Sequence, residues 1–300
     1  MKKILVTGKN GQLGWELQRV LASSAQIIAL DSDVMDLADA DAIRRTVREI
    51  RPDVIINPAA YTAVDKAETD AELAMAVNGI APGVLADEAK LLGSVLVHYS
   101  TDYVFDGSKA TPYSEADVAN PQSVYGRTKY AGEQAVLASG CKHLVLRTSW
   151  VYGVHGGNFV KTILRLAKER SELRIVADQF GAPTWARDLA QSTATALSRW
   201  MEKDFDPKIC GLYHLTAAGR TNWHEYAEEI VHLARKYDAA LSSKSLNIRA
   251  ITTQEYPVPA KRPANSVLAN NKIRDAFGIV MPAWQDSLAE CVRLIYAQPA

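Results

Sequence analysis

A tyrosine and a lysine four residues apart form the pair in this sequence with the clearest chemical potential. Tyr125-Gly126-Arg127-Thr128-Lys129 lies in a segment whose periodicity predicts a helix, and residues four apart share one face of a helix. A phenol has a pKa of about 10, and a lysine ammonium beside it favours the phenolate. We therefore expect Lys129 to lower the pKa of Tyr125, so that the phenol exchanges a proton with a substrate oxygen near neutral pH.

A threonine at the end of a predicted strand supplies a third group. Thr101 follows the apolar run Val95–Ser100, and its hydroxyl can hydrogen-bond the oxygen on which Tyr125 acts. A tyrosine and a lysine at this spacing are common by chance on exposed helix faces, so the prediction depends on the combination. Thr101, Tyr125 and Lys129 are the predicted catalytic residues.

Three glycines follow the first apolar run and open the next predicted helix. The turn is Gly8-Lys9-Asn10-Gly11-Gln12-Leu13-Gly14. Glycines let the backbone turn sharply there and approach a pyrophosphate at a helix N-terminus. Asp31 ends the second strand, where a carboxylate favours a ribose with a free 2′-hydroxyl, as in NADH, while Lys9 offers a counter-charge to the 2′-phosphate of NADPH. We therefore expect NADH or NADPH as cofactor.

Short apolar runs alternate with helical patterns through the first half of the chain. The predicted strands are Lys3–Thr7, Ile27–Leu30, Val54–Asn57, Val95–Ser100 and Leu144–Thr148, and the predicted helices are Gln12–Leu21, Ala40–Ile50, Ala71–Leu92 and Val124–Ala138. Continuous apolar strands separated by helices predict a parallel sheet covered on both faces, a Rossmann-type doubly wound α/β fold. Ligands bind at the carboxyl ends of such strands, and each candidate site follows one of these runs.

The second half is less regular and predicts a smaller C-terminal substrate-binding lobe. Its expected helices are Phe159–Lys168, Ala186–Met201, Trp223–Tyr237 and Trp284–Ala297, and the proline-rich stretch Tyr256–Pro263 cannot be a helix interior. We expect residues 1–150 plus about 183–217 to form the dinucleotide-binding domain. Residues of about 151–182 plus 218–300 form the predicted lobe.

The composition limits the partners and the compartment. The chain has 300 residues, 48% of them hydrophobic, with a formal net charge of zero and no long basic run, so no nucleic acid or membrane partner is expected. No apolar stretch approaches the length of a membrane span. Three widely spaced cysteines suit free thiols in a cytoplasmic, reducing compartment. The six histidines form no ligand cluster, so we predict no catalytic metal.

The residues above resemble the extended short-chain dehydrogenase/reductase family, and most closely its nucleotide-sugar reductases. The resemblance spans nearly the whole chain. The segments that carry it are Val6–Gly14, Asn57–Glu68, Ser100–Gly107, Val124–Lys129, Arg147–Gly153, Asp178–Thr184 and Arg262–Ser266.

The resemblance implies a role for each matching position. The residues that would line the dinucleotide are Gly8, Asn10, Gly11, Gln12, Leu13, Asp31, Ala59 and Ala60, together with Tyr125 and Lys129. Those that would surround the sugar are Thr62, Val64, Asp102 and Trp150. Arg262, Asn265 and Ser266 lie in a loop that grips the nucleotide sugar in such enzymes; a planar guanidinium also suits a phosphate by its own geometry. Trp150 could equally be a core residue, and we assign Trp15 and Trp185 to packing.

The implied activity is reduction of the 4-keto group of a dTDP-sugar by NADH or NADPH, in a monomer or homodimer. Another nucleotide-sugar epimerase or reductase of the same family and a non-catalytic dinucleotide-binding regulatory subunit remain alternatives. A dehydratase of the family carries Thr-Asp-Glu where this chain has Thr101-Asp102-Tyr103, so the base for the elimination is absent. Some relatives are thought to use Mg²⁺ at a subunit contact, where Glu16 is the matching residue; one carboxylate gives that metal little support.

Overall fold

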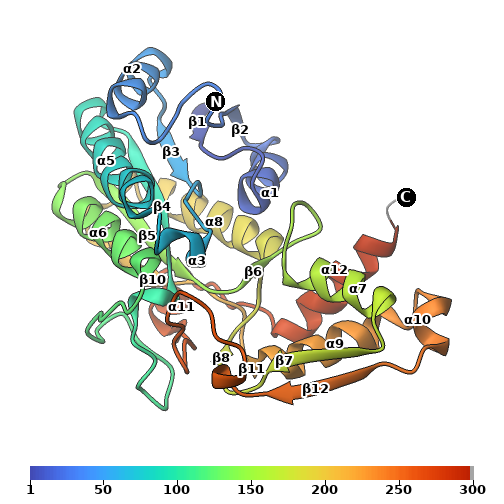
Figure 1. Ribbon diagram of the computed structural model, residues 1–300. Coiled ribbons are helices and arrows are strands. Elements are labelled where there is room, and N and C mark those ends of the chain that lie inside the picture. The colour runs from blue at the N-terminus through green and yellow to red at the C-terminus, as the bar shows by residue number, and fades with distance from the viewer. Residues whose placement is uncertain (298–300) are drawn as a thin grey trace.

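The computed structural model describes residues 1–297 and centres on a six-stranded parallel sheet (Figure 1). The strand order changes direction between the neighbours β1 and β3, so their carboxyl ends form the point where a ligand is expected. The predicted fold class is confirmed, although the edge strand β10 was not among the predicted strands. In spatial order the strands are β10 (Gly211–His214), β5 (Lys142–Thr148), β4 (Val95–Thr101), β3 (Val54–Asn57), β1 (Lys2–Val6) and β2 (Ala25–Ala29).

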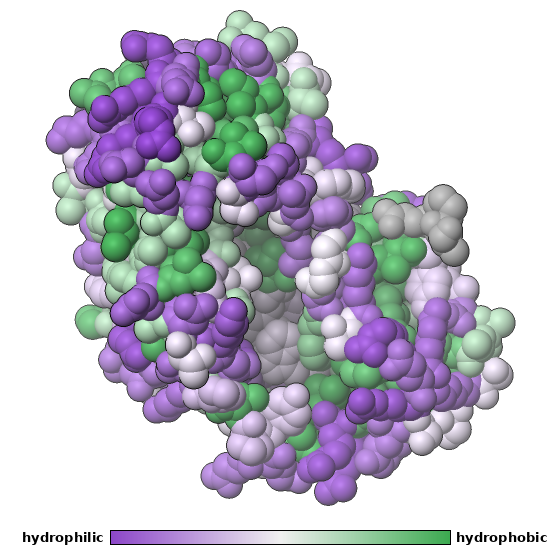
Figure 2. Space-filling model, turned by 45° about the horizontal axis from the view of Figure 1, so that its top comes forward, coloured by the Kyte–Doolittle hydropathy of each residue, from purple (hydrophilic) through white to green (hydrophobic). Residues whose placement is uncertain are grey.

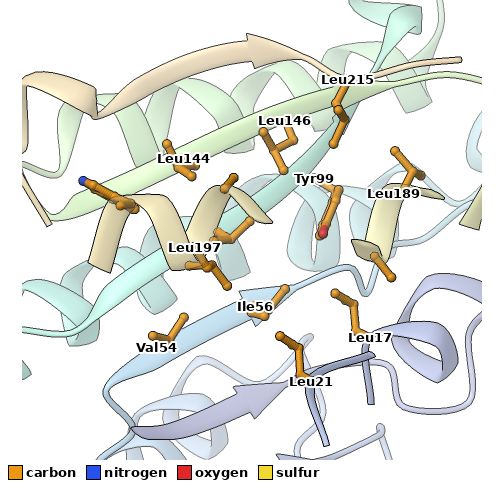
Figure 3. Close-up of a cluster of buried hydrophobic side chains, with 14 of the residues drawn as sticks. Leu17, Leu21, Val54, Ile56, Tyr99, Leu144, Leu146, Leu189, Leu197 and Leu215 are labelled. Atoms are coloured by element: carbon orange, nitrogen blue, oxygen red, sulfur yellow. The ribbon is translucent and has the colours of Figure 1, made fainter. Parts of the chain in front are cut away.

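Helices cover both faces of the sheet because successive strand residues point to opposite sides. Ile4 and Val6 lie in one buried cluster and Leu5 in the other. Figure 3 shows the first cluster, where β3, β4 and β5 meet leucines of two covering helices. The helices on this face are α1 (Gln12–Leu21), α8 (Ala186–Met201) and α11 (Asn271–Phe277). The opposite face carries α2 (Ala40–Ile50), α5 (Ala81–Leu92) and α6 (Val124–Ala138).

The segment predicted as one helix over Ala71–Leu92 is interrupted in the structure. It consists of α4 (Ala71–Met75), a π-helical turn over Ala76–Ile80, and then α5. π-Helical turns inside helices often occur at functional sites. This one brings Asn78 toward the predicted catalytic helix, as described below.

The C-terminal lobe has a buried cluster of its own, built from α7, α9, α12 and the strand pair β7–β12. The predicted helices are confirmed, with α7 one residue longer than predicted and α9 ending at Ala234 instead of Tyr237. The lobe's main elements are α7 (Phe159–Glu169), β7 (Glu172–Val176), α9 (Trp223–Ala234), α10 (Ala239–Ser243), β12 (Asn247–Ile251) and α12 (Trp284–Ala297). Two further pairs consist of two-residue strands: β6 (Val151–Tyr152) lies beside β9 (Thr184–Trp185), and β8 (Phe180–Gly181) lies beside β11 (Thr221–Asn222).

The division into two domains remains a prediction, and the packing adds one detail to it. Ile273 and Phe277 of α11 are buried in the cluster on the sheet, although residues 218–300 were assigned to the lobe. Figure 2 shows a hollow between the larger body and the smaller lobe. None of the helices within residues 1–297 has the length and apolar character that crossing a bilayer requires.

Candidate active site

The glycine turn after β1 is shaped for close approach of another backbone or a ligand. Gly8 has φ +60°, and a Cβ at Gly8 would lie 3.0 Å from the Ala59 side chain. A Cβ at Gly14 would overlap the Gly8 carbonyl oxygen. The turn leads directly into α1, whose first backbone N–H groups have no partner within the helix. These residues therefore fit a dinucleotide pyrophosphate at the helix N-terminus.

The predicted ribose contact, Asp31, also supports the glycine turn. Its Oδ2 accepts a hydrogen bond from the Asn10 backbone N–H at 3.1 Å, and its Oδ1 accepts one from Ser32 N–H at 2.9 Å. Lys9, the predicted counter-charge to the 2′-phosphate of NADPH, already forms an ion pair within the protein: its Nζ lies 3.8 Å from Asp33 Oδ1.

The loop after β3 is held against β1 by buried polar groups that the sequence reasoning missed. Thr7 Oγ1 donates to Asn57 Oδ1 at 2.6 Å and accepts from the Ala59 backbone N–H at 3.3 Å. The Asn57 amide also lies 3.1 Å from His98 Nδ1. Burial keeps the pKa of His98 well below its ordinary value, so this neighbour of the site is neutral. Ala59 is thereby placed beside Gly8, as the predicted dinucleotide site requires.

The predicted catalytic residues converge at the carboxyl end of β4. Ser123 caps α6, its hydroxyl accepting from Gly126 N–H at 3.1 Å, so Tyr125 lies in the first turn. Lys129 is buried one turn later and its Nζ donates to the Tyr99 carbonyl oxygen at 2.5 Å. Thr101 ends β4, and its hydroxyl lies close enough to the Tyr125 phenol to lower the pKa of that phenol. Sequence spacing therefore identified groups that the fold brings together.

The prediction that Lys129 lowers the pKa of Tyr125 is wrong for the protein without dinucleotide. Burial raises the pKa of Tyr125, and only the hydrogen bond with Thr101 opposes the shift. Burial also lowers the pKa of Lys129 to about 8, against the opposing effect of Glu133. The physical reason is desolvation, which disfavours the charged form of both groups. A phenol that keeps its proton at neutral pH suits a proton donor.

The pKa of Lys129 leads to a prediction for the pH dependence of the reaction. Since the ammonium is present below about pH 8 and is lost above it, kcat/KM for the reduced dinucleotide should fall as pH rises through 8. This ratio reports groups of the free enzyme. A Lys129→Arg variant keeps its charge, so its profile should stay flat there even if its activity is lower. A wild-type profile that declines only above pH 10 contradicts this assignment.

Asn78, in the π-helical turn, ties three parts of the site together. Its side chain accepts from Tyr61 N–H at 2.9 Å and donates to the Tyr61 carbonyl oxygen at 3.0 Å. The same amide lies 3.3 Å from Thr128 Oγ1, the residue before Lys129. Asn78 thus connects the loop after β3 to the catalytic helix. An asparagine beside a glycine within a helical pattern was the only sequence signal.

A buried ion pair fixes the catalytic helix on the sheet. Arg147 of β5 donates to both carboxylate oxygens of Glu133, at 2.8 and 2.7 Å, and both side chains are almost fully buried. The guanidinium also lies 5.0 Å from the centre of the Phe105 ring. Glu133 is one turn beyond Lys129, so the pair sets the rotation of α6 that presents Lys129 to β4.

Asp102 is a buried carboxyl directly beside Thr101, the predicted catalytic threonine. Thr101 Oγ1 donates to Asp102 Oδ1 at 2.9 Å and accepts from Tyr103 N–H at 3.2 Å. Burial raises the pKa of Asp102 to about 6, and the nearby Ser266 and Thr101 hydroxyls partly oppose the shift. The Ser266 hydroxyl donates to the Phe180 carbonyl oxygen at 3.2 Å. Ser266, predicted to contact the nucleotide sugar, therefore lies near the catalytic strand end.

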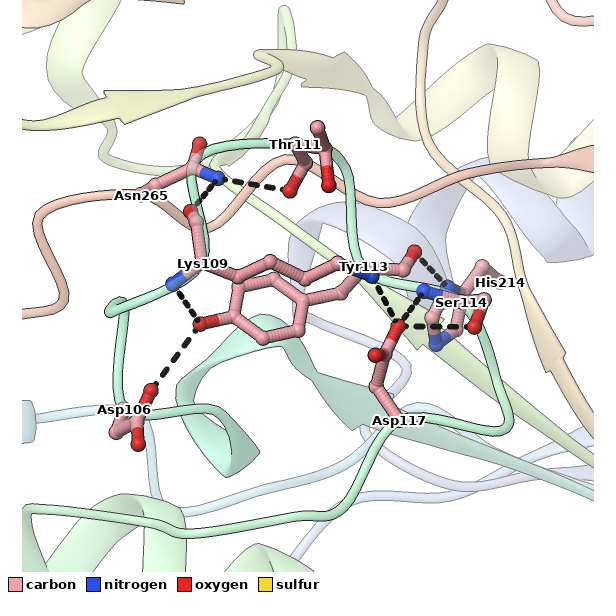
Figure 4. Close-up of polar contacts among 8 residues, drawn as sticks. All are labelled: Asp106, Lys109, Thr111, Tyr113, Ser114, Asp117, His214 and Asn265. Atoms are coloured by element: carbon pink, nitrogen blue, oxygen red, sulfur yellow. Dashed lines mark hydrogen bonds and ion pairs between the residues drawn. The ribbon is translucent and has the colours of Figure 1, made fainter.

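The other two residues of that predicted loop bind to the protein itself. Arg262 donates to Tyr103 Oη at 2.6 Å and to Asp65 Oδ2 at 2.7 Å. Asn265 uses its amide to donate to the carbonyl oxygens of Lys109, at 2.8 Å, and Thr111. Figure 4 shows Asn265 over the 106–117 loop, inside which Tyr113 donates to Asp106 at 3.1 Å. Asn265 thus shapes the loop, while Arg262 keeps further N–H donors for an anion.

The remaining predicted sugar contacts lie on three segments. Trp150 follows β5, is partly exposed and has φ +46°. Thr62 is exposed in the loop after β3, and Val64 begins the short helix α3 (Val64–Ala67).

The two tryptophans assigned to packing lie against other parts of the protein. Trp15 is half-buried and stacks on His155 with 5.1 Å between ring centres, and Trp185 is buried.

Glu16, the residue suggested to contact magnesium, lies near a positively charged side chain of the same chain. Glu16 is buried, and Arg187 Nε lies 3.7 Å from its Oε2. Burial raises the pKa of Glu16, with Arg187 opposing the shift. Across the described residues, no group of three or more His, Cys, Asp or Glu is placed to hold a metal ion. A lone carboxylate facing a guanidinium does not fit Mg²⁺, which prefers several oxygen ligands.

Comparison with known proteins agrees with this geometry. A dTDP-4-dehydrorhamnose reductase of Burkholderia thailandensis is 50% identical over 99% of this chain and 100% of its own length. The crystal structure of a Clostridium acetobutylicum dTDP-4-dehydrorhamnose reductase matches with a TM-score of 0.87 at 41% identity, over 98% of this chain and 99% of that one. The Bacillus anthracis enzyme in complex with NADP matches with a TM-score of 0.86 at 36% identity, over 98% and 99%.

The family assignment rests on nearly the full length of the chain. Residues 1–296 match the family model described as the RmlD substrate binding domain. The glycine turn, the Thr101–Tyr125–Lys129 group and the two-lobed fold all lie within the matched range. The chain therefore belongs to the RmlD substrate binding domain family.

Proposed function

We propose that this protein reduces the 4-keto group of dTDP-4-dehydro-L-rhamnose to give dTDP-L-rhamnose, with NADPH or NADH as reductant. The observation that carries the proposal is the position of Thr101, Tyr125 and Lys129 at the carboxyl end of β4, on the same edge of the parallel sheet as the glycine turn after β1. Full-length similarity to dTDP-4-dehydrorhamnose reductases supports the choice of substrate.

The side chains have separate tasks in the proposed reaction. When bound, the reduced nicotinamide supplies a hydride. Tyr125, whose pKa is raised by burial, donates its proton to the carbonyl oxygen as that oxygen gains negative charge. Thr101 hydrogen-bonds the same oxygen. Lys129 places a cation next to the phenol as the phenol loses its proton, and Asn78 and Glu133 hold the helix from which it acts.

The proposed substrate contacts divide between sugar and diphosphate. Asp102, Thr62, Val64 and Trp150 surround the sugar in this proposal, next to the catalytic strand end. Arg262 uses the N–H donors not taken by Tyr103 and Asp65 to bind the diphosphate. Ser266 lies near Asp102 and donates to the Phe180 carbonyl oxygen, and Asn265 holds the 106–117 loop.

An assay of dinucleotide oxidation with the authentic keto sugar tests the proposed function. We expect about one NAD(P)H consumed per keto sugar, by the stoichiometry of hydride transfer, with dTDP-L-rhamnose as product. Interconversion of 4-epimeric sugars without net NAD(P)H consumption indicates an epimerase instead. Absence of turnover with intact dinucleotide binding indicates a regulatory subunit.

The same assay compares the two dinucleotides. Asp31 favours a free 2′-hydroxyl, and Lys9 already pairs with Asp33, so NADH should be usable. A relative of this chain was crystallised with NADP, so NADPH should be accepted too. A kcat/KM more than about a hundredfold in favour of NADPH contradicts the role given to Asp31.

The proposed setting is the cytoplasm, with the enzyme working as a monomer or homodimer. The three cysteines are free thiols, two of them buried, as expected in a reducing compartment. The proposed partner is the dTDP-sugar.

A further inference from the structure

Trp150 has a backbone conformation that tryptophan rarely adopts. Its φ of +46° lies in the left-handed region, which is uncommon for residues other than glycine and is strained for a bulky side chain. Such strain persists only when the surroundings hold the residue in place, and it concentrates at ligand-binding sites. Trp150 comes two residues after Thr148, which lies beside the catalytic Thr101 in the register of β4 and β5.

Two residues from the C-terminal half hold the Trp150 ring. Trp223, the first residue of α9, stacks on it with 3.5 Å between ring centres and 9° between planes. Gly181 packs on its edge, where a Cβ would come within 2.5 Å of the indole. Trp223 is backed in turn by Phe159 at 4.7 Å. Trp223 therefore covers one face of the Trp150 ring. Trp150 is partly exposed, and the exposed part is the surface that Trp223 and Gly181 do not cover.

We propose that Trp223 is a positioning residue for substrate binding: it holds Trp150 as a rigid wall against the sugar. This inference rests on the proposed function, because the sugar is the ligand that Trp150 would contact. An indole face suits the C–H surface of a 6-deoxy sugar, and a wall fixed in advance loses little entropy on binding. Because the stack joins the end of β5 to α9, substrate binding also links the sheet domain to the lobe.

Steady-state kinetics of two Trp223 variants test the proposal. Trp223→Ala removes the stacking partner of Trp150, and we expect KM for the keto sugar to rise roughly tenfold or more. Loss of the stacking interaction between the two aromatic rings accounts for part of this rise. KM for the dinucleotide and kcat should change less than about threefold. Trp223→Phe keeps a ring in place and should recover most of the lost affinity. The near-ultraviolet circular dichroism of the stacked indoles should disappear in both variants.

The controls separate positioning from folding and from the proposed function. Tyr237→Ala removes a different stacked aromatic pair, Tyr237–Tyr296, and should leave both KM values unchanged. Thermal denaturation establishes that each variant is folded at the assay temperature. A folded Trp223→Ala variant with wild-type KM for the keto sugar overturns the proposal. A fall in kcat together with equal rises in KM for the keto sugar and for the dinucleotide overturns it as well, because these changes indicate a general structural defect. Failure of the wild-type enzyme to reduce the sugar refutes the proposed function instead.

Discussion

Replacing Tyr125 with phenylalanine should lower turnover by roughly 10²–10⁴-fold, the usual contribution of a positioned acid or base. The change removes one oxygen and leaves the ring in place. Because burial raises the pKa of this phenol, the group is protonated at neutral pH, and its loss removes the proton donor for the nascent alkoxide. Fluorescence titration should show dinucleotide binding close to that of the wild type, since Lys129 and the glycine turn are intact.

A second tyrosine on the same helix provides a matched control. Tyr130 is partly buried against Val104, Phe105 and Leu268. Tyr130→Phe makes the identical chemical change five residues away and should keep nearly full turnover. Near-normal turnover in Tyr125→Phe would refute the catalytic assignment. Similar losses in both variants would point to disturbance of α6 as the cause.

Replacing Arg147 with methionine should destabilise the protein by about 3–5 kcal/mol, the usual cost of leaving one partner of a buried ion pair alone. Glu133 is fully buried and receives both of its charged hydrogen bonds from this guanidinium. The variant should also be less active, because the Arg147–Glu133 pair sets the rotation of α6 that presents Lys129 to β4. Urea denaturation measures the loss of stability.

The pair Arg293–Glu290 tests whether burial is the cause. It has the same two-point geometry, with both contacts at 2.7 Å, but lies on the surface with side chains 50% and 42% exposed. Arg293→Met should leave the unfolding midpoint nearly unchanged, because surface ion pairs contribute little. Equal effects of the two substitutions would show that the buried pair has no special role.

Local patterns were sufficient for much of the fold and for proposing a catalytic group. The five predicted strands and the order of helices between them follow from apolar runs and periodicity, and the structure places them in one parallel sheet. Tyr125 and Lys129 were identified because helical spacing is a local property. Edge strand β10 was missed because Gly211–His214 is not a continuous apolar run, unlike the equally short β3. The pair β7–β12 and the two-residue pairs were also missed, since β7 and β12 alternate polar with apolar residues and strands of two residues carry almost no periodic signal.

The electrostatic state of the site was decided by the tertiary structure. The sequence places Lys129 one turn from Tyr125, and this spacing suggested that the ammonium lowers the pKa of the phenol. The fold buries both groups and directs Lys129 toward the Tyr99 carbonyl oxygen, so desolvation becomes the dominant effect on each pKa. Burial depends on what other segments pack around a residue, which no spacing within one helix can reveal.

By itself, the sequence determined the class of fold and the position of the glycine turn, because apolar runs, helical periodicity and the spacing of glycines are local properties. Only the tertiary structure brought Asn78 to Thr128, Arg147 to Glu133 and Trp223 to Trp150. These partners lie 50, 14 and 73 residues apart in the sequence. Their contacts arise when the sheet closes and the lobe packs against it, and they set the rotation of α6 and the strained conformation of Trp150.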